Sequence, residues 1–405
     1  MKRRILLVFI TGLLAVLIAA VIVDVVAGWR LRREYARLEQ RFGVLDARGG
    51  FAPEVPDEDN SARVIRAASI LVVRGPGRQN YTQMRTALGQ YENASASAPI
   101  PEDVRAFIDA NAEALRVADL AVTKRQANWE ADYLAGDDMP RFLFVRGLSD
   151  AAYVSAVRAT KEGHADEASR HLITGLAVAA SLRNERSLIA QLIRISVAAQ
   201  QFEGVRRLIA DTAPPAAALT ALARALSGSA ATDPMQVGLL GELRYGNNEI
   251  LKMERSSKWR LLRPFVRLAR RDYLLEMERL LDLQAGPRPH PPYVNRSARW
   301  PWDWRKITLA YTPGLQRAID SGDDFTTMRG VAEAGVALRR YGLEHGTYPD
   351  DLSALVPAYL PKVPLDAATG RPPAYARSGA GFTLKGLSSR QGSAASPALE
   401  WTVTK

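Results

Sequence analysis

The sequence contains no cysteine in its 405 residues, which excludes disulfide bonds, thiol catalysis, zinc sites built on cysteine and a lipoprotein anchor. Histidine is scarce as well, with four residues. The chain also lacks a Gly-x-Ser-x-Gly elbow, a Walker loop, a dinucleotide-binding fingerprint and a His-Glu-x-x-His motif. Any catalysis would therefore have to be built from scattered carboxylates, and no pair of these stands out in the sequence.

The longest apolar run extends from Ile5 to Val23, and Thr11 is its only polar side chain. Nineteen residues of helix at about 1.5 Å each match the roughly 30 Å hydrocarbon core of a bilayer. Three basic residues precede the run and favour a cytoplasmic N-terminus. The alanine- and arginine-rich composition resembles that of proteins from GC-rich bacteria. We therefore predict a single-pass anchor in a bacterial inner membrane, with the bulk of the chain in the periplasm.

Two observations leave alternatives to this anchor open. Val25-Val26-Ala27 before Gly28 would suit a signal-peptide cleavage site, although the apolar run is longer than the 7–15 residues usual for such peptides. The far flank of the run is also basic, which weakens the charge argument for orientation. Its basic residues are Arg30, Arg32, Arg33, Arg37 and Arg41. We favour an uncleaved anchor with its N-terminus inside.

The net charge is +11, and most of the excess lies outside the apolar segment. The strongest basic cluster is interleaved with Trp259, Leu262, Phe265 and Val266. Its members are Arg255, Lys258, Arg260, Arg263, Arg267, Arg270 and Arg271. Such a basic amphipathic helix could lie on anionic lipid or contact nucleic acid, or simply present a solvated face. The solvated face is the favoured reading, anionic lipid comes second, and no nucleic-acid partner is expected.

Apolar residues recur at three- and four-residue spacing through most of the chain, which predicts a mainly α fold built as a helical hairpin or bundle body. Asn60 or Ser61 is expected to cap its first helix. We expect a loop over 75–101, one helical stretch over 235–283 and a last helix that starts after Ser321 or Asp323. The predicted segments are a transmembrane anchor (1–28), a juxtamembrane helix and linker (29–60), a helical body (61–286), a Pro/Trp-rich connector (287–320) and a long helix with a small α+β module (321–405).

Two further features of this pattern carry predictions. The connector's Trp300, Trp302 and Trp304 are expected to pack it onto the body. His164, Glu167 and His171 lie at i, i+3 and i+7, so a continuous helix would place them on one face, a set that suits zinc. Because Gly163 is expected in a turn directly before them, a solvated helix face is the favoured interpretation. No metal or other cofactor is predicted.

The C-terminal part contains the one recognisable segment. It reads Tyr-Gly-Leu-Glu-His-Gly-Thr-Tyr-Pro-Asp-Asp-Leu over 341–352, followed by a Pro/Asp/Gly-rich loop and a hairpin signal at 378–381. This segment resembles the one that follows the long helix in major pseudopilins of type II secretion. The resemblance implies a helix that stops at Gly346, a turn at Tyr348-Pro349 and a small sheet with a β-hairpin.

The same segment departs from a pseudopilin in two ways. The anchor lies more than 300 residues away, and the N-terminus has no prepilin cleavage site. The full layout is closer to a group of uncharacterised membrane-anchored bacterial envelope proteins. Asp350, Asp351 and Asp366 could ligate calcium in the loop, but capping of turns is the favoured role for them.

These observations lead to one preferred function and two alternatives. The preferred function is a membrane-anchored envelope scaffold or interaction protein that binds a protein partner, which we favour over an enzyme. The alternatives are an envelope hydrolase whose site has no linear motif, and a sensor that docks on a lipid surface. Substrate and partner cannot be read from the sequence.

Overall fold

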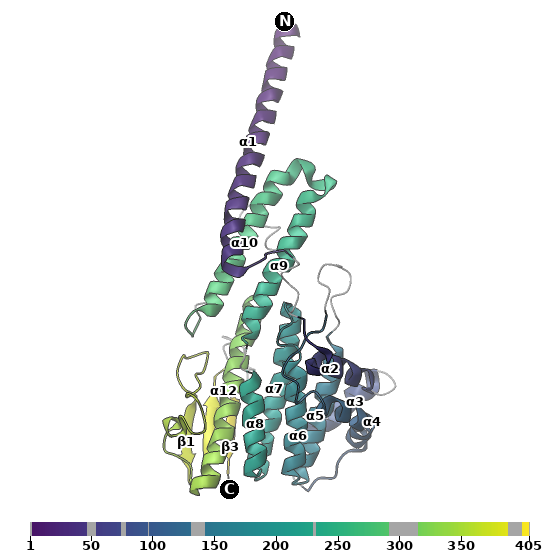
Figure 1. Ribbon diagram of the computed structural model, residues 1–405, viewed down its shortest axis with the longest axis vertical. Helices are drawn as coiled ribbons and strands as arrows, with labels where there is room; N and C mark the ends of the chain where they lie inside the picture. Colours follow the sequence, from purple (N-terminus) through teal and green to yellow (C-terminus); the bar gives the residue numbers. More distant parts are fainter. Residues whose placement is uncertain are drawn as a thin grey trace.

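The computed structural model describes residues 2–46, 54–73, 78–95, 97–130, 142–229, 232–290, 315–387 and 399–404, and of residues 2–9, 78–80, 229, 260, 261, 316 and 399 it describes the backbone alone. A long N-terminal helix projects from one end, and a helical body and a small sheet lie at the other (Figure 1). The predicted mainly α class with a small C-terminal α+β module is confirmed. Of the predicted connector (287–320), residues 291–314, which include its three tryptophans, lie outside the described residues, and 315–320 form the start of the last helix.

The described elements follow one another as a helical series that ends in three strands. They are α1 (Lys2–Phe42), η2 (Asp57–Asp59), α2 (Ser61–Ile70), α3 (Arg78–Asn93), α4 (Glu102–Asp119), α5 (Phe144–Lys161), α6 (Ala165–Ala180), α7 (Leu188–Asp211), α8 (Ala216–Ser229), α9 (Pro234–Arg255), η3 (Ser257–Leu262), α10 (Arg263–Ala285), α12 (Leu315–His345), η4 (Leu352–Leu355), β1 (Ala374–Ser378), β2 (Gly381–Gly386) and β3 (Leu399–Val403). The strand order is β1-β2-β3, and both pairs are antiparallel.

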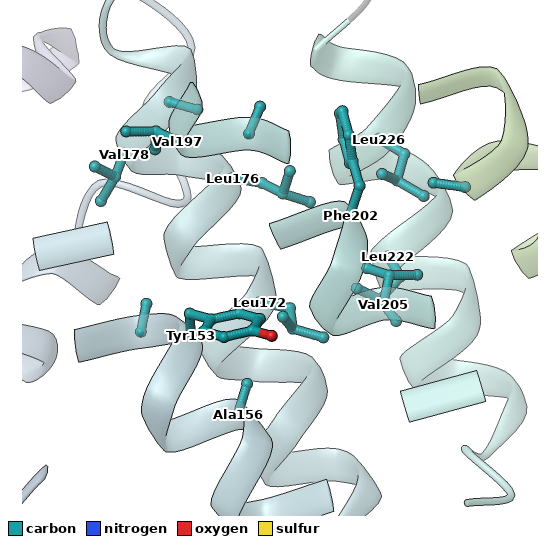
Figure 2. Close-up of a cluster of buried hydrophobic side chains, with 14 of the residues drawn as sticks. Tyr153, Ala156, Leu172, Leu176, Val178, Val197, Phe202, Val205, Leu222 and Leu226 are labelled. Atoms are coloured by element: carbon teal, nitrogen blue, oxygen red, sulfur yellow. The ribbon is translucent and has the colours of Figure 1, made fainter. Parts of the chain in front are cut away.

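The larger of two hydrophobic cores fills the body. Figure 2 shows Tyr153, Leu172, Phe202 and Leu222 meeting from α5, α6, α7 and α8 respectively. Close packing is possible because small residues line the contact faces. At Gly204, for example, an added Cβ would stand 2.3 Å from a methyl of Leu172. The core therefore fixes the separation of α6 and α7.

Asn60 starts the body, as predicted, because its side chain accepts a hydrogen bond from the Ala62 amide and caps α2. Its side-chain amide donates to the carbonyl of Asn128, at 2.9 Å, and its carbonyl oxygen accepts from the Asn128 amide at 3.0 Å. Asn60 is fully buried. The cap thus also ties the first helix of the body to the segment that follows α4.

The second core joins α1 to the hairpin formed by α9 and α10. Its buried side chains include Leu31 and Leu38 from α1, Leu243 from α9, and Tyr273 and Met277 from α10. The hairpin arms touch where Gly246 faces Tyr273, since an added Cβ would lie 2.2 Å from the phenol oxygen. The N-terminal helix is therefore packed into the protein over its second half.

The prediction of one helical stretch over 235–283 was wrong. The chain turns at Ser256, runs through η3 and re-enters a helix at Arg263. Pro264 stands in the first turn of α10, where its missing N–H is not needed, so it can begin a helix but could not continue one. The basic cluster consequently spans the hairpin turn and the first part of α10, and does not lie along one straight amphipathic helix.

Two other helix boundaries differ from expectation. The predicted loop over 75–101 contains α3, and α12 begins at Leu315, before the expected caps. The Ser321 hydroxyl donates to the carbonyl of Arg317 within the helix, and the carboxylate of Asp323 accepts a hydrogen bond from Arg288. Polar side chains of the type that often cap helices thus stand inside α12, where other partners satisfy them.

The C-terminal module packs against the end of α12. Gly346 ends the helix with a φ of +70°, as predicted, a conformation that glycine adopts without a steric cost. The hairpin forms at the predicted position, with Ser378 opposite Gly381, and β3 completes the sheet. Trp401 covers α12 at Gly335, where an added Cβ would lie 2.2 Å from its ring.

The largely buried carboxyl of Glu242, on α9, should make the stability of the fold depend on pH. Burial raises the pKa of Glu242 to about 7, from 4.5. The ionised form is therefore disfavoured in the folded protein, and the contribution of this group to stability falls as the pH rises from 4.5 to 7. We expect Glu242→Gln to raise the unfolding free energy at pH 8, by up to about 3 kcal/mol, and to have little effect at pH 4.

Thermal unfolding of the detergent-solubilised full-length protein at both pH values would measure this difference. The control is Glu249→Gln, which removes a carboxylate that pairs with Lys252 on the same helix. A gain in stability that is equal at pH 4 and pH 8 would contradict the assignment.

Candidate functional site

The first candidate site is the junction where α1 leaves the rest of the protein. Among the described helices, α1 is the one long and apolar enough to cross a bilayer, a criterion that a signal sequence near an N-terminus also meets. The apolar side chains from Ile10 to Val26 are exposed, whereas Ala27 and Leu31 are buried against the hairpin. The exposed part of α1 therefore ends near residue 26, just beyond the apolar run, and the packed part begins there.

Asp24 marks this boundary with a pair of cations from α10. Its carboxylate lies 3.1 Å from Arg263 and 3.0 Å from Arg267. Arg267 also donates to the Asp24 carbonyl and to Glu254 of α9, at 3.2 and 2.8 Å. The start of α10 is thus fastened at the level where the apolar run ends.

A second set of ion pairs fastens the lower half of α1 to α10. Arg37 makes two bonds to Glu278, at 2.6 and 2.7 Å, and Arg41 adds one at 2.8 Å and reaches Asp282. The Arg37 guanidinium holds the pKa of Glu278 below its usual range. These contacts fix the register between two helices that run in the same direction.

The chain that follows α1 is held by α9. Gly43 turns it with a φ of +74°, and Arg244 then binds the carbonyls of Phe42 and Val44 at 3.0 and 2.9 Å. Asn247 donates to the carbonyl of Leu45 at 2.8 Å. The backbone therefore leaves α1 along a defined path.

The seven predicted basic residues divide into two groups. Arg267 and Arg270 are internal: Arg270 bonds to Asn247 and Glu254, lies 5.3 Å over the ring of Tyr35, and has a pKa lowered by burial. Arg271 is partly buried beside Asp272. The exposed members are Arg255, Lys258 and Arg263. The side chain of Arg260 lies outside the described residues.

The exposed basic residues share the hairpin turn with large apolar side chains. Leu262 is 48% exposed and Phe265 is 45% exposed. The turn points toward the N-terminal half of α1 (Figure 1). We call residues 255–265 the hairpin tip. It combines cations with apolar side chains on one outward-facing loop.

The predicted zinc candidates stand next to one another but in an unfavourable arrangement. His164 is an exposed N-cap residue, and its Nδ1 lies 3.8 Å from Glu167; Nε2 of His171 lies 3.5 Å from the same carboxylate. Arg158 also binds Glu167, and a guanidinium there opposes a second cation. Burial lowers the pKa of His171. Within the described residues, no group of three or more histidine and acidic side chains is arranged to hold a metal ion.

A groove of about 980 Å³ separates α8 and α12 from the loop over 359–365. One side is apolar and includes Pro361, Val363, Pro364 and Leu365. The charged side chains that line it are Arg224, Arg288, Arg329, Arg340, Lys362 and Glu333. Burial raises the pKa of Glu333, against the effect of Arg329 and Lys362. Five cations around one partly buried acid give the groove a positive potential.

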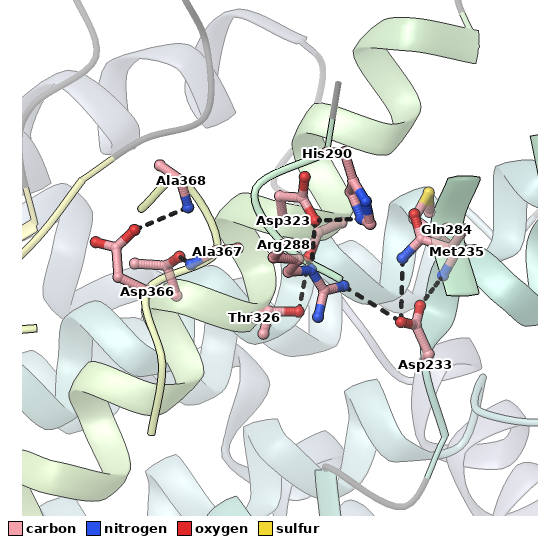
Figure 3. Close-up of polar contacts among 12 residues, drawn as sticks. Asp233, Met235, Gln284, Arg288, His290, Asp323, Thr326, Asp366, Ala367 and Ala368 are labelled. Carbon is pink, nitrogen blue, oxygen red and sulfur yellow. Dashed lines mark hydrogen bonds and ion pairs between the residues drawn. The ribbon is translucent and has the colours of Figure 1, made fainter. Parts of the chain in front are cut away.

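A polar network adjoins this groove through Arg288 (Figure 3). Arg288 donates to Asp323 of α12 at 2.8 Å and lies 3.5 Å from Asp233. Asp233 caps α9 and accepts from Gln284 at 3.1 Å, and His290 lies 3.4 Å from Asp323. Burial raises the pKa of Asp323 and lowers that of His290. The network joins the start of α9, the end of α10 and the middle of α12.

A smaller cleft of about 350 Å³ lies among α3, α5 and α7. Its Asp150 accepts from Arg85 at 3.2 Å and from Gln200 at 2.9 Å, and Tyr81 donates to it as well. Its other two acidic residues also have cationic partners, since Glu92 lies 3.5 Å from Arg207 and Glu203 lies 2.6 Å from Arg206. All three carboxylates serve in internal pairs.

The predicted capping role of the C-terminal aspartates is confirmed for two of them. Asp366 is buried and accepts from the amides of Ala368, Thr369 and Leu387. Asp351 accepts from the amide of Ser353. Asp350, by contrast, is exposed and pairs with Arg377 at 2.9 Å.

Comparisons with known proteins add no family or fold assignment. The chain matches no protein-family model, no curated protein and no solved structure. The candidate sites therefore rest on the geometry of this chain.

Glu278 offers a test of the packing between α1 and α10. Because it receives bonds from both Arg37 and Arg41, Glu278→Gln should lower the unfolding free energy, by about 1–2 kcal/mol once exposure of the two arginines is allowed for. Glu276→Gln is the control, since Glu276 pairs with Arg279 on its own helix. Thermal unfolding of the full-length protein in detergent gives both values. Equal losses for the two variants would contradict a specific role for the α1–α10 pairs.

Proposed function

We propose that this protein is a single-pass scaffold of the bacterial envelope, which holds a protein-binding surface in a fixed orientation to the membrane. The observation that carries the proposal is the continuity of α1. The helix runs from the apolar segment directly into a packed three-helix unit without a flexible joint. A chain that only needed tethering would not require this arrangement, because any linker of sufficient length would serve.

The scaffold reading is also supported by the connection between the two cores. Leu315 and Ile319 at the start of α12 belong to the core around α1, and Phe325 and Val331 further along belong to the body. Because one helix enters both cores, the orientation of the anchor is transmitted to the body. The groove lies on this same helix.

The binding surface in this proposal is the groove, and its partner is an acidic protein segment with apolar side chains. Arg224, Arg340 and Lys362 supply attraction for carboxylates, whereas Arg288 and Arg329 already pair with acidic residues of this chain. The apolar contact comes from Pro361, Val363 and Leu365. Extended or helical peptides bind such grooves through alternating anchors.

The membrane part of the proposal predicts where two introduced cysteines react. The chain has no native cysteine, so Lys2→Cys and Leu343→Cys each give one reactive thiol. With the N-terminus inside, a membrane-impermeant maleimide should label Leu343→Cys in spheroplasts, and should label Lys2→Cys only after permeabilisation. The reverse pattern would contradict the orientation. Loss of residues 1–27 from the mature protein would show a cleaved signal sequence and would contradict the anchor.

The partner part predicts charge-dependent peptide binding. A fluorescent peptide of alternating leucine and acidic residues should bind the detergent-solubilised protein more tightly than its Gln/Asn counterpart. Arg224→Glu with Lys362→Glu should weaken binding of the acidic peptide at least ~10-fold, about 1.4 kcal/mol, because both side chains are exposed at the groove. Arg105→Glu, on the exposed face of α4, is the control.

Equal weakening by the control, or equal binding of both peptides, would contradict the groove as the acidic-segment site. Turnover by the purified protein in a broad hydrolase panel would favour the enzymatic alternative.

A further inference from the structure

We propose that the hairpin tip is a second membrane contact, which rests on the surface of an anionic bilayer beside α1. This inference rests on the proposed function, since it takes α1 to span the membrane. It identifies a lipid-binding surface and its ligand chemistry, anionic phospholipid headgroups with the adjoining acyl boundary.

The hairpin tip lies at the level where a membrane-spanning α1 would leave the hydrocarbon core. Arg263 pairs with Asp24, the residue that follows the apolar run, and Gly28 lies so close to Arg267 that an added Cβ would be 3.0 Å from its guanidinium. Five residues of helix separate Val23 from Gly28, or about 8 Å along the axis. The headgroup layer is of similar depth, about 5–8 Å on each side of the hydrocarbon core. An α1 that spans the bilayer therefore brings the start of α10 to headgroup level.

The hairpin tip also faces the side on which the bilayer would lie. The turn between α9 and α10 is the end of the hairpin that points toward the N-terminal half of α1 (Figure 1). The opposite end of the hairpin leads to the body through the network around Asp233 and Arg288. The tip is consequently the part of the hairpin that faces the bilayer.

The exposed side chains of the hairpin tip are basic and apolar, which suits an anionic membrane surface. Residues 255–263 contain four basic residues and no acidic one. Arg255, Lys258 and Arg263 are exposed there, and so are the apolar side chains of Leu262 and Phe265. Each Lys or Arg near an anionic surface contributes about 1 kcal/mol, and apolar side chains beside them enter the acyl boundary. Exposed leucine and phenylalanine on a water-facing loop would otherwise remain in contact with solvent.

The internal arginines bind the two arms of the hairpin to each other and to α1. Arg267 and Arg270 both bind Glu254, across the two arms of the hairpin, and Arg267 also reaches Asp24. These bonds hold the start of α10 in place while Arg255 and Lys258 stay exposed, and Arg263 is exposed and also pairs with Asp24. The tip thus needs no rearrangement to meet the bilayer, which lowers the entropic cost of contact.

A single fluorescent probe tests this surface in the full-length protein. Leu262→Cys carries an environment-sensitive nitrobenzoxadiazole dye, and Leu343→Cys, exposed near the end of α12, is the matched control. Both proteins are reconstituted in nanodiscs that contain phosphatidylglycerol and a spin-labelled quencher lipid. We expect quenching at residue 262 to be at least ~3-fold stronger than at residue 343, with a blue-shifted emission.

Charge is tested by Arg255→Glu with Lys258→Glu in the Leu262→Cys background, and by nanodiscs of phosphatidylcholine alone. Each change should reduce quenching at residue 262, although the position that α1 imposes should keep it above the level of the control. Equal quenching at both positions in phosphatidylglycerol nanodiscs, or quenching at residue 262 that neither change reduces, would overturn the proposal. Extraction of the protein from native membranes by alkaline carbonate would instead defeat the membrane-spanning function, so the two failures are distinguishable.

Discussion

The structure depends on the packing of the second half of α1 against α9 and α10. Leu31 and Leu38 supply the apolar contact, and Arg37 and Arg41 fix the register through Glu278. Apolar burial alone would allow the helices to slide by a turn, because leucines repeat along each face. The ion pairs remove that freedom, since the carboxylate must meet two guanidinium groups at once. The position of every later element relative to the apolar segment follows from this register.

The features that the sequence predicts well are those that short-range chemistry controls. The run from Ile5 to Val23, the Asn60 cap and the hairpin over 378–381 each depend on a few neighbouring residues. The hairpin at Ser256 was missed although Pro264 signalled a helix start, because apolar spacing continues on both sides of the turn. The early start of α12 was missed because Asp323 resembles a cap, whereas Arg288 satisfies it from another segment.

The candidate sites were less accessible to sequence reasoning. The basic cluster was visible, but its division into exposed and internal arginines depends on Asp24 and Glu254, which lie on other helices. The groove was not visible, because Arg224, Arg329 and Lys362 come from three separate segments with no common spacing. Charge that gathers through tertiary packing leaves no periodic signal, so the net charge of +11 could not locate a basic surface.

The parallel course of α1 and α10 has a mechanical consequence. Their contact extends from Asp24 to the Arg41–Asp282 pair, roughly 25 Å of helix at 1.5 Å per residue. In the proposed membrane-spanning arrangement, a pull along α1 would load this contact in shear, so the ion pairs and leucines along its length would resist together and would not break one after another. The carbonyls of Val44 and Leu45 accept bonds from Arg244 and Asn247 of α9, so the linker that follows them would not carry this force. In that proposed arrangement, force applied at the bilayer would reach the body through the packed helices and not through a flexible linker.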